Sequence, residues 1–416
     1  MRTIARNADI QERFYSTRRS LLFLTSIVLV LFQSSHAQNL TVLHMFTGGN
    51  DGGSPYGELV FDTSGNLYGT TGEAGKYGAG VVFKLKPNDK EVVLHQFTGM
   101  KNGGNPYFGS LTMDTAGNLY GTTSSGGRFG VGTVFELSAK RGEKVLYSFG
   151  TTGGDGENPL GSVIRDGAGN LYGTTYIGGN YNCNPPLGCG VVFKIDPTGK
   201  ETILHAFDGA PDGAQPQRGL LLDSQGNLYG TTFEGGTGVC DIHPTCGTVF
   251  RIDAEGNETI VHNFSGYPTD GANPDSNLIS DSAGNLYGTT SFGGTHDWGT
   301  IFKINPHGKE KVLYNFAGYS KQDGASPSGP LIRDAAGNLY GTTWSGGVVG
   351  DGTIFKLDRS GKETVLHSFS YSDGAFPYSG LVLDSAGNLY GTTSGGGTGN
   401  CKSGYNCGLI FKLSPN

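Results

Sequence analysis

Short apolar stretches, separated by stretches rich in glycine, aspartate, asparagine and proline, recur along the chain from about residue 40 to its end. Four of them make one unit, and in one such unit they cover residues 219–223, 227–232, 248–252 and 258–264. Each has the length of a strand and the residue types that strands favour, and no helical periodicity interrupts the series. The pattern predicts an all-β chain built from units of four antiparallel strands.

The heptapeptide Gly-Asn-Leu-Tyr-Gly-Thr-Thr marks each unit. Its seven copies are spaced 50 to 58 residues apart and begin at Gly65, Gly117, Gly169, Gly226, Gly284, Gly337 and Gly387. Seven four-stranded units of this period predict a seven-bladed β-propeller. We place it in one domain, residues 38–416, with repeats near 41–98, 99–150, 151–208, 209–265, 266–317, 318–370 and 371–416.

The two ends of the repeat region are incomplete in complementary ways. The region opens with a single strand of the fourth type, 41–46, and closes with a strand of the third type, 409–413, that has no fourth. We expect the N-terminal strand to complete the last blade. Such pairing closes the ring and removes two exposed sheet edges.

Residues 1–37 lie outside the repeats and resemble an export signal. Arg18 and Arg19 precede an apolar run, 21–32, that is short for a membrane span and is followed by a small-residue cleavage pattern. We expect cleavage after Ala37 and a monomeric product that is secreted or periplasmic, with no later membrane span. That product would carry a formal charge of −10, from 24 basic and 34 acidic side chains, which argues against nucleic acid and anionic membranes as partners.

The six cysteines form three pairs of identical spacing, and each pair lies between the second and third strands of its unit. In an exported protein this arrangement predicts three local disulfides. Zinc is the less favoured alternative, since no histidine or further cysteine recurs beside the pairs at ligand spacing. The pairs are Cys183 with Cys189, Cys240 with Cys246, and Cys401 with Cys407.

Three repeated polar positions are interpreted as structural. Asp-x-x-Gly-Asn joins the first two strands of every unit and has the composition of a hairpin turn. The Asp-Gly turns before each unit, from Asp51 to Asp373, are expected around the central opening; turn formation is favoured there over a calcium site, and no cofactor is expected. The fourth strand carries a histidine or tyrosine, which suits half-buried packing with a polar tip. These residues are His44, His95, Tyr147, His205, His262, Tyr314 and His367.

A site peculiar to this protein must lie where the copies differ. The loops after Thr-Thr differ strongly and carry both tryptophans of the chain. Aromatic rings beside polar side chains suit the apolar faces and hydroxyls of sugars, although such rings also pack against neighbouring blades. The candidate ligand-binding residues are Trp298, Trp344, Phe292, Tyr176, Phe233, Arg218 and Glu234.

The sequence offers no catalytic motif. It lacks Gly-x-Ser-x-Gly, His-Glu-x-x-His and a phosphate-binding loop. Polar residues that occur in one copy only show no triad spacing, so we assign no catalytic residue and no metal ligand. These residues are Arg218, Glu234, Asp241, His243, Asp275, His296, Asp297 and Asp351.

The units resemble those of the GloVer tandem-repeat proteins, a bacterial family of exported chains with repeats close to Asp-Gly-Ala-x-Pro, Gly-Asn-Leu-Tyr-Gly-Thr-Thr and Gly-Thr-Val-Phe-Lys-Leu. The resemblance covers essentially residues 38–416. It implies a surface or secreted β-propeller, often held by one of several C-terminal anchors, and it implies no particular activity. This chain ends at Leu413-Ser-Pro-Asn416 without such an anchor, which favours release.

Together these observations favour a secreted binding or interaction module over an enzyme, with carbohydrate or another extracytoplasmic polymer as its ligand. One alternative is a metal-dependent lyase or lactonase of the propeller type, with a divalent cation in the central channel. Another is a structural surface or matrix protein without a small ligand. The fold alone does not separate these three, because propellers host all of them.

Overall fold

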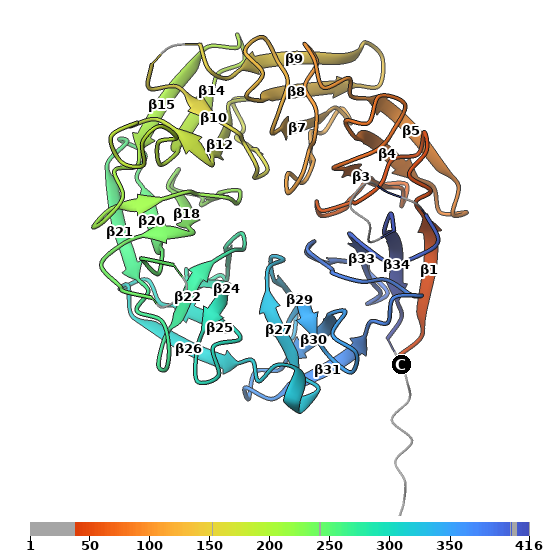
Figure 1. Cartoon of the computed structure of the whole chain (residues 1–416), viewed down its shortest axis with the longest axis vertical. Helices are drawn as coiled ribbons and strands as arrows, with labels where there is room; N and C mark the ends of the chain where they lie inside the picture. The colour runs from red at the N-terminus through yellow and green to blue at the C-terminus, as the bar shows by residue number, and fades with distance from the viewer. Residues whose placement is uncertain (1–37, 152, 241–242, 400, 402–405, 416) are drawn as a thin grey trace, which may run out of the picture. The chain divides into compact units, whose positions relative to one another are not determined.

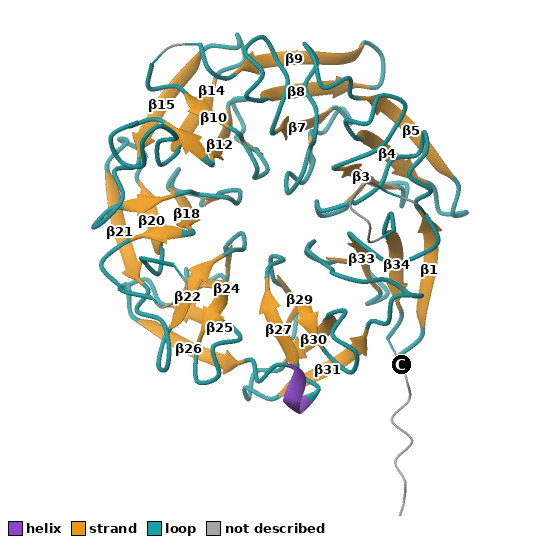
Figure 2. Cartoon of the chain, in the orientation of Figure 1, coloured by secondary structure: helices purple, strands orange, loops and turns teal. Residues whose placement is uncertain are grey.

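The computed structural model describes residues 38–416 except 152, 241–242, 400, 402–405 and 416. The expected export signal, residues 1–37, and Asp241 lie outside the described residues. Gln38–Asn416 form one compact unit. Apart from one 3-10 helix, η1 (Tyr319–Lys321), its regular structure in the described part is all strand (Figure 2).

Seven antiparallel sheets of four strands are arranged around a central axis, which confirms the predicted seven-bladed propeller (Figure 1). From the axis outwards, the first six blades are β2 (Val60–Phe61), β3 (Leu67–Thr71), β4 (Val81–Leu85), β5 (Glu91–Gln96); β6 (Thr112–Met113), β7 (Leu119–Thr123), β8 (Thr133–Ser138), β9 (Gly142–Ser148); β11 (Ile164–Arg165), β12 (Leu171–Thr175), β14 (Val191–Ile195), β15 (Glu201–Ala206); β17 (Leu221–Leu222), β18 (Leu228–Thr232), β20 (Thr248–Ile252), β21 (Glu258–Asn263); β23 (Ile279–Ser280), β24 (Leu286–Gly293), β25 (Thr300–Ile304), β26 (Glu310–Asn315); and β28 (Ile332–Arg333), β29 (Leu339–Gly346), β30 (Thr353–Leu357), β31 (Glu363–Ser368).

The seventh blade is built from both ends of the propeller. Its strands are β32 (Val382–Leu383), β33 (Leu389–Thr393), β34 (Leu409–Leu413) and β1 (Leu40–Met45). Strand β1 pairs antiparallel with β34 from Leu40 opposite Leu413 to Met45 opposite Leu409, and in Figure 1 the red β1 lies beside the dark blue β34. The predicted closure of the ring is confirmed.

Four connections between blades add a short ribbon. Each pairs with the second strand of the next blade or with the residues just after it: β10 (Gly156–Glu157) with β13 (Ile177–Gly178), β16 (Gly213–Ala214) with β19 (Glu234–Gly235), β22 (Gly271–Pro274) with β24, and β27 (Gly324–Pro327) with β29.

The core lies between neighbouring blades and rests on a repeated phenylalanine and glycine. Phe250 in β20 is fully buried, and its ring centroid is 5.1 Å from that of Phe207 at the end of the preceding blade. Gly230 in β18 leaves room for this ring, because a Cβ there would lie 2.4 Å from the Phe250 Cζ. The glycine of Leu-Tyr-Gly-Thr-Thr is therefore needed for the packing of the core.

The Asp-x-x-Gly-Asn segments form the expected hairpin turns. In the first blade, Asp62 Oδ1 accepts hydrogen bonds from the backbone N–H groups of Ser64 and Asn66, and Oδ2 accepts from the Asn66 amide and the Tyr68 hydroxyl. Gly65 has φ 77°, which favours glycine. The aspartates of these segments are turn formers.

Candidate functional site at the mouth of the axis

The side chains that enter the central opening differ from blade to blade. A proline precedes the first strand of every blade, and the chain then turns inward towards the axis. The position three residues before the first buried Leu or Val is occupied in turn by Tyr56, Phe108, Leu160, Gln217, Asp275, Ser328 and Tyr378.

Residues from five blades meet here. The ring centroid of Tyr56 is 5.7 Å from that of Phe108 and 5.6 Å from that of Tyr378. The Arg218 guanidinium lies 4.3 Å from the Phe108 ring centroid, and its Nε donates to Asp275 Oδ1 at 2.6 Å. We call Tyr56, Phe108, Arg218, Asp275 and Tyr378 the axial cluster. Blades that are not neighbours in the ring, such as the second and the fourth, can touch only at its centre. The axial cluster therefore fills the central opening where these side chains meet.

The axial cluster contains a buried cation with spare hydrogen-bonding capacity. Arg218 is 5% exposed, and its Nη2 is buried without a hydrogen-bond partner among the described residues. Glu58 lies nearby and accepts a hydrogen bond from the Ser110 hydroxyl at 3.1 Å; burial raises its pKa to about 7, against the opposing effect of the Arg218 charge. Between these groups there is a cavity of about 10 Å³, room for about one water molecule.

Further aromatic rings continue from the axial cluster onto the surface. Trp344 follows the last Thr of its heptapeptide in β29, is 37% exposed, and has its ring centroid 5.8 Å from those of Phe376 and Tyr378. On the other side, Tyr107 lies 5.6 Å from Tyr56. These six rings from four consecutive blades form what we call the aromatic rim: Trp344, Phe376, Tyr378, Tyr56, Tyr107 and Phe108.

One residue of the aromatic rim stands in a backbone conformation that does not suit it. The residue before the inward-turning proline has a positive φ of 52–58° in all seven blades, and six of these residues are Ser, Asn or Gln. The seventh, Phe376, has φ 58°. A phenylalanine tolerates this region less well than asparagine, and such residues persist mainly where the surroundings or a function require them.

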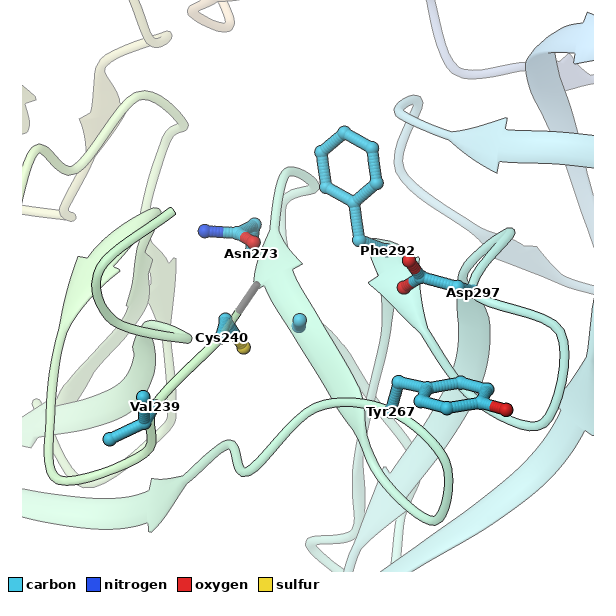
Figure 3. Close-up of a pocket in the computed structure, with 7 residues that line it drawn as sticks. Val239, Cys240, Tyr267, Asn273, Phe292 and Asp297 are labelled. Atoms are coloured by element: carbon cyan, nitrogen blue, oxygen red, sulfur yellow. The ribbon is translucent and has the colours of Figure 1, made fainter. Parts of the chain in front are cut away.

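Four of the candidates form a second group, over blades three to five. The His243 ring lies 5.0 Å from Phe233 and 6.0 Å from Phe292, and its Nδ1 is 3.3 Å from a Glu234 carboxylate oxygen. Burial, with Glu234 as a second cause, raises the pKa of Tyr176. Phe292 also lines a cavity of about 50 Å³ together with Val239, Cys240, Tyr267, Ala272, Asn273 and Asp297 (Figure 3).

Trp298 belongs to neither group. Its ring centroid is 5.3 Å from that of Tyr319, and it packs against Gly318, in the connection between the fifth and sixth blades. The structure thus divides the seven candidates among three places. Arg218 and Trp344 lie at the mouth of the axis. The second group, on blades three to five, contains Tyr176, Phe233, Glu234 and Phe292. Trp298 belongs to neither place.

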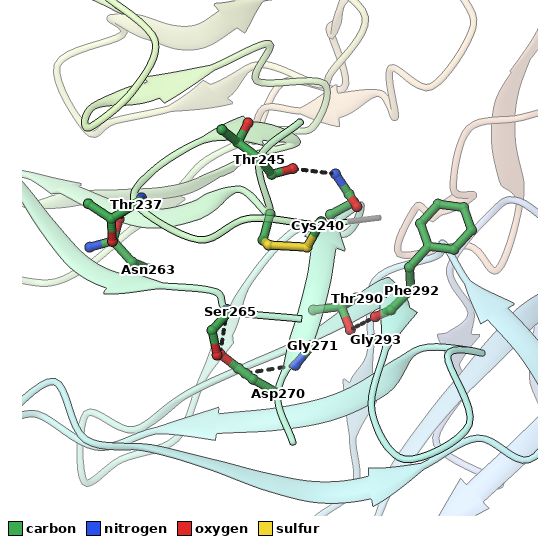
Figure 4. Close-up of a disulfide and its surroundings, with 12 residues drawn as sticks. Thr237, Cys240, Thr245, Asn263, Ser265, Asp270, Gly271, Thr290, Phe292 and Gly293 are labelled. Atoms are coloured by element: carbon green, nitrogen blue, oxygen red, sulfur yellow. Dashed lines mark hydrogen bonds between the residues drawn. A yellow bond between two sulfur atoms is a disulfide. The ribbon is translucent and has the colours of Figure 1, made fainter. Parts of the chain in front are cut away.

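The three expected disulfides are present. Cys183–Cys189, Cys240–Cys246 and Cys401–Cys407 have Cα–Cα distances of 5.9, 5.4 and 5.1 Å. Figure 4 shows the Cys240–Cys246 bridge beside Thr245. The backbone carbonyls of Thr245 and Phe233 both accept hydrogen bonds from the Asn273 amide. The bridge therefore supports the loop that leads to the second group of candidates.

The structure corrects the expected position of the Asp-Gly aspartates. Asp212 Oδ2 lies 3.0 Å from His205 Nε2 in the outer strand β15, so these aspartates line the outer seams between blades and not the central opening. Among the described residues, the sets of His, Cys, Asp and Glu that bring ligand atoms within 4.8 Å of one another are His205, Asp212, Glu258 and His262, Asp270, Glu310, both at seams. At the mouth of the axis, where these aspartates were expected, the structure has aromatic rings and Arg218.

Sequence reasoning missed most of the axial cluster and the aromatic rim. It named Arg218 and Trp344 as ligand contacts and listed Asp275 among the polar residues that occur in one copy only. It did not name Tyr56, Phe108 or Tyr378. The usable indication was the variation at the position three residues before the first buried Leu or Val of each blade, where Tyr, Phe, Leu, Gln, Asp and Ser replace one another.

Comparison with known proteins now adds the family. The family model of the Gloeobacter/Verrucomicrobia repeat matches residues 30–243 and 241–416. The chain belongs to this family. No curated protein matches this Gloeobacter/Verrucomicrobia repeat chain. No helix in the described part is both long and apolar enough to cross a membrane.

Solved structures similar to this Gloeobacter/Verrucomicrobia repeat protein support the propeller fold. The extracellular domain of a putative hybrid two component system from B. thetaiotaomicron has a TM-score of 0.54 at 16% identity, covering 91% of this chain and 41% of that one. The extracellular domain of a putative one component system from the same organism has a TM-score of 0.52 at 13% identity, with the same two coverages. The chain thus spans less than half the length of either.

Proposed function

We propose that this chain is an extracytoplasmic binding module that holds a carbohydrate polymer against the aromatic rim at the mouth of the axis. The observation that carries the proposal is the run of six contacting rings from four blades, at positions where the repeats differ. A scaffold that needed these rings for closure would repeat them in every blade. Three of the seven blades, the third to the fifth, contribute no ring to the rim, which argues against such a need.

The chemistry of the rim suits sugars. Aromatic faces pack against the apolar faces of pyranose rings, and polar groups beside them meet the hydroxyls. Here the half-buried polar groups beside the rings are Glu58 and Ser110. The axial cavity of about 10 Å³ is far smaller than a typical small-molecule pocket. An extended ligand that lies across the rim fits this surface better than a small molecule held within it.

The conformation of Phe376 supports a role for the rim in binding. Its backbone amide donates to the carbonyl of Asp351 at 2.9 Å, the bond that Ser, Asn and Gln make at the equivalent positions of other blades. The backbone therefore does not require phenylalanine. Its ring, 5.8 Å from that of Trp344, extends the rim away from the axis.

The three disulfides support a location outside the cytoplasm, because such bonds persist in oxidising compartments. The expected export signal, residues 1–37, points the same way. We propose that the chain functions in the periplasm or outside the cell.

The test is a binding screen of the purified chain against polysaccharides and cell-wall fractions, followed by two matched variants. Trp344 and Trp298 are both 37% exposed, but only Trp344 belongs to the rim. We expect Trp344→Ala to weaken binding at least about tenfold, as for a central aromatic contact, and Trp298→Ala to leave it unchanged. Equal binding by both variants, or weakening by Trp298→Ala alone, would place the site elsewhere. Binding to no polymer would favour a structural role.

A further inference from the structure

The outer seams between blades have a repeated set of three polar residues that the proposed function does not use. Each set consists of the His or Tyr of one outer strand, the Asp of the following Asp-Gly turn, and the first residue of the outer strand in the next blade. We call such a set a seam triad. Two neighbouring seam triads, one on each side of the fourth blade, contain a histidine and two carboxylates.

These two seam triads are compact. In the first, His205 Nε2 lies 3.0 Å from Asp212 Oδ2, with Glu258 beside them. In the second, His262 Nε2 lies 3.3 Å from Asp270 Oδ2, with Glu310 beside them. Within each triad the three ligand atoms all lie within 4.8 Å of one another.

The polar groups of both triads are incompletely satisfied. Glu258 Oε1 and Glu310 Oε1 are shielded from solvent and have no hydrogen-bond partner among the described residues. Asp270 is 8% exposed; its Oδ1 accepts from the Gly271 N–H and its Oδ2 from Ser265 (Figure 4), which fixes the carboxylate in place. Each triad therefore presents one free carboxylate oxygen beside an oriented carboxylate and an imidazole.

The charge at these seams is unbalanced. Each triad combines two carboxyl groups with one imidazole, and the ion pairs of Asp212 and Asp270 found in the described part are with the histidines alone. A divalent cation at the seam would offset this excess of carboxyl groups.

We propose that each of these two seam triads binds one divalent metal ion of the zinc class, through the histidine Nε2 and one oxygen from each carboxylate. Imidazole nitrogen and carboxylate oxygen are ligands that zinc accepts at about 2.0–2.2 Å, and tetrahedral geometry then places the ligand atoms roughly 3.3 Å apart. Small side-chain movements from the observed spacing achieve this. The site goes beyond the proposed carbohydrate binding and does not depend on it.

The other five seams provide natural controls within the same chain. Tyr147 and Tyr314 replace the histidine at two of them, Asn102 replaces the aspartate at a third, and Leu40 replaces the glutamate at a fourth. The fifth has His44, Asp51 and Glu91, but the set is more open: His44 Nε2 lies 3.6 Å from Asp51 Oδ2, and the three ligand atoms do not all come within 4.8 Å of one another. The proposal therefore assigns about two metal ions to the chain, not seven.

The substitution His→Tyr is the natural choice for a test. At the seam of Tyr147, the tyrosine hydroxyl lies 3.0 Å from both an Asp155 and a Glu201 oxygen. Tyrosine therefore maintains hydrogen bonds to both carboxyl groups of the seam without an imidazole. The full chain would be stripped of metal with a chelator and titrated with zinc by calorimetry, and with cobalt to follow its visible absorption. We expect about two equivalents for the parent, about one for His205→Tyr or His262→Tyr, and none for the double variant.

A second set of measurements separates the seams from other zinc-binding positions. His243 and Glu234 form a pair at 3.3 Å on the surface and provide the control variant His243→Ala, which should keep both equivalents. Zinc should also raise the melting temperature of the parent but not of the double variant, because it binds only the folded seam. Unchanged stoichiometry in the double variant, loss of zinc in His243→Ala, or no binding by the parent at pH 8 would each overturn the proposal.

Discussion

The outer seams and the axial mouth of this propeller follow opposite rules. At the seams, neighbouring blades use the same few residues, with His and Tyr exchanged at one position and Asp and Asn at another. At the mouth, the position after the inward-turning proline changes from Tyr56 to Leu160 to Asp275. Every seam joins two blades in the same way, so one solution serves all of them. The axis exists once, so each blade contributes its own side chain there. Repetition therefore marks the scaffold, and variation marks the place to look for function.

The largest expected effect comes from the buried ion pair at the mouth. Arg218→Met would leave Asp275 without its cation, and we expect the free energy of unfolding to fall by about 3–5 kcal/mol. In the double variant Arg218→Met/Asp275→Leu the Asp275 charge is removed together with its cation, and most of the loss should be recovered. Urea unfolding of the three proteins measures this. If the double variant were as unstable as the single one, the Arg218–Asp275 pair itself would be required for the stability of the fold.

A smaller effect is expected from pH, and it arises at the seams. Burial and the neighbouring aspartate raise the pKa of Glu201 to about 7 and that of Glu363 to about 8, from an ordinary value of 4.5. A carboxyl group with a raised pKa in the folded state stabilises the fold below its unfolded pKa, and this contribution is lost as pH rises through the folded value. We therefore expect the melting temperature to fall between pH 6 and pH 8.5, measured with a chelator present.

The variant Glu363→Gln sharpens this test. Glutamine remains neutral at every pH and keeps a donor where the protonated carboxyl has one, so the decrease with pH should become smaller. The matching change Glu255→Gln, in an exposed turn, should leave the decrease as it is. A melting temperature that rises over this pH range would contradict the account of the seam glutamates.

The smallest expected effect separates stability from binding at a single residue. Phe376→Asn replaces a phenylalanine with φ 58° by a residue that accepts this conformation more readily, so we expect the free energy of unfolding to rise by about 0.5–1 kcal/mol. The same change removes one ring of the aromatic rim and should weaken ligand binding. Urea unfolding and a binding titration on the same preparation measure both. Loss of stability would mean that the Phe376 ring serves the scaffold.

Much of the fold could be predicted because it depends on residues close together in sequence. Local structure is determined by the heptapeptide Gly-Asn-Leu-Tyr-Gly-Thr-Thr, the Asp-x-x-Gly-Asn turns and the short cysteine loops. Ring closure followed from counting strand types at the two ends. The contacts at the axis could not be predicted in this way, because Tyr56 and Tyr378 lie at opposite ends of the chain and meet only once the ring has closed.

The two tryptophans show the limit most clearly. In the sequence both follow the Thr-Thr pair and precede the third strand of their units, so both were predicted as ligand contacts on equal grounds. Trp344 directly follows the Thr-Thr pair and stays near the axis, whereas Trp298 lies at the far end of its loop, just before β25, and packs against Tyr319. In the same way, the seam glutamates were overlooked because each faces a histidine or tyrosine of the preceding blade, as Glu201 faces Tyr147.

We propose that the carbohydrate ligand contacts the aromatic rim. The fluorescence of variants with a single tryptophan tests this most directly. The chain has two tryptophans, so Trp298→Phe leaves only Trp344 and Trp344→Phe leaves only Trp298. On titration with the polymer found in the screen, we expect the emission of Trp344 to shift and saturate while that of Trp298 stays constant. A saturating shift at Trp298 with none at Trp344, under conditions where both variants bind, would contradict the account.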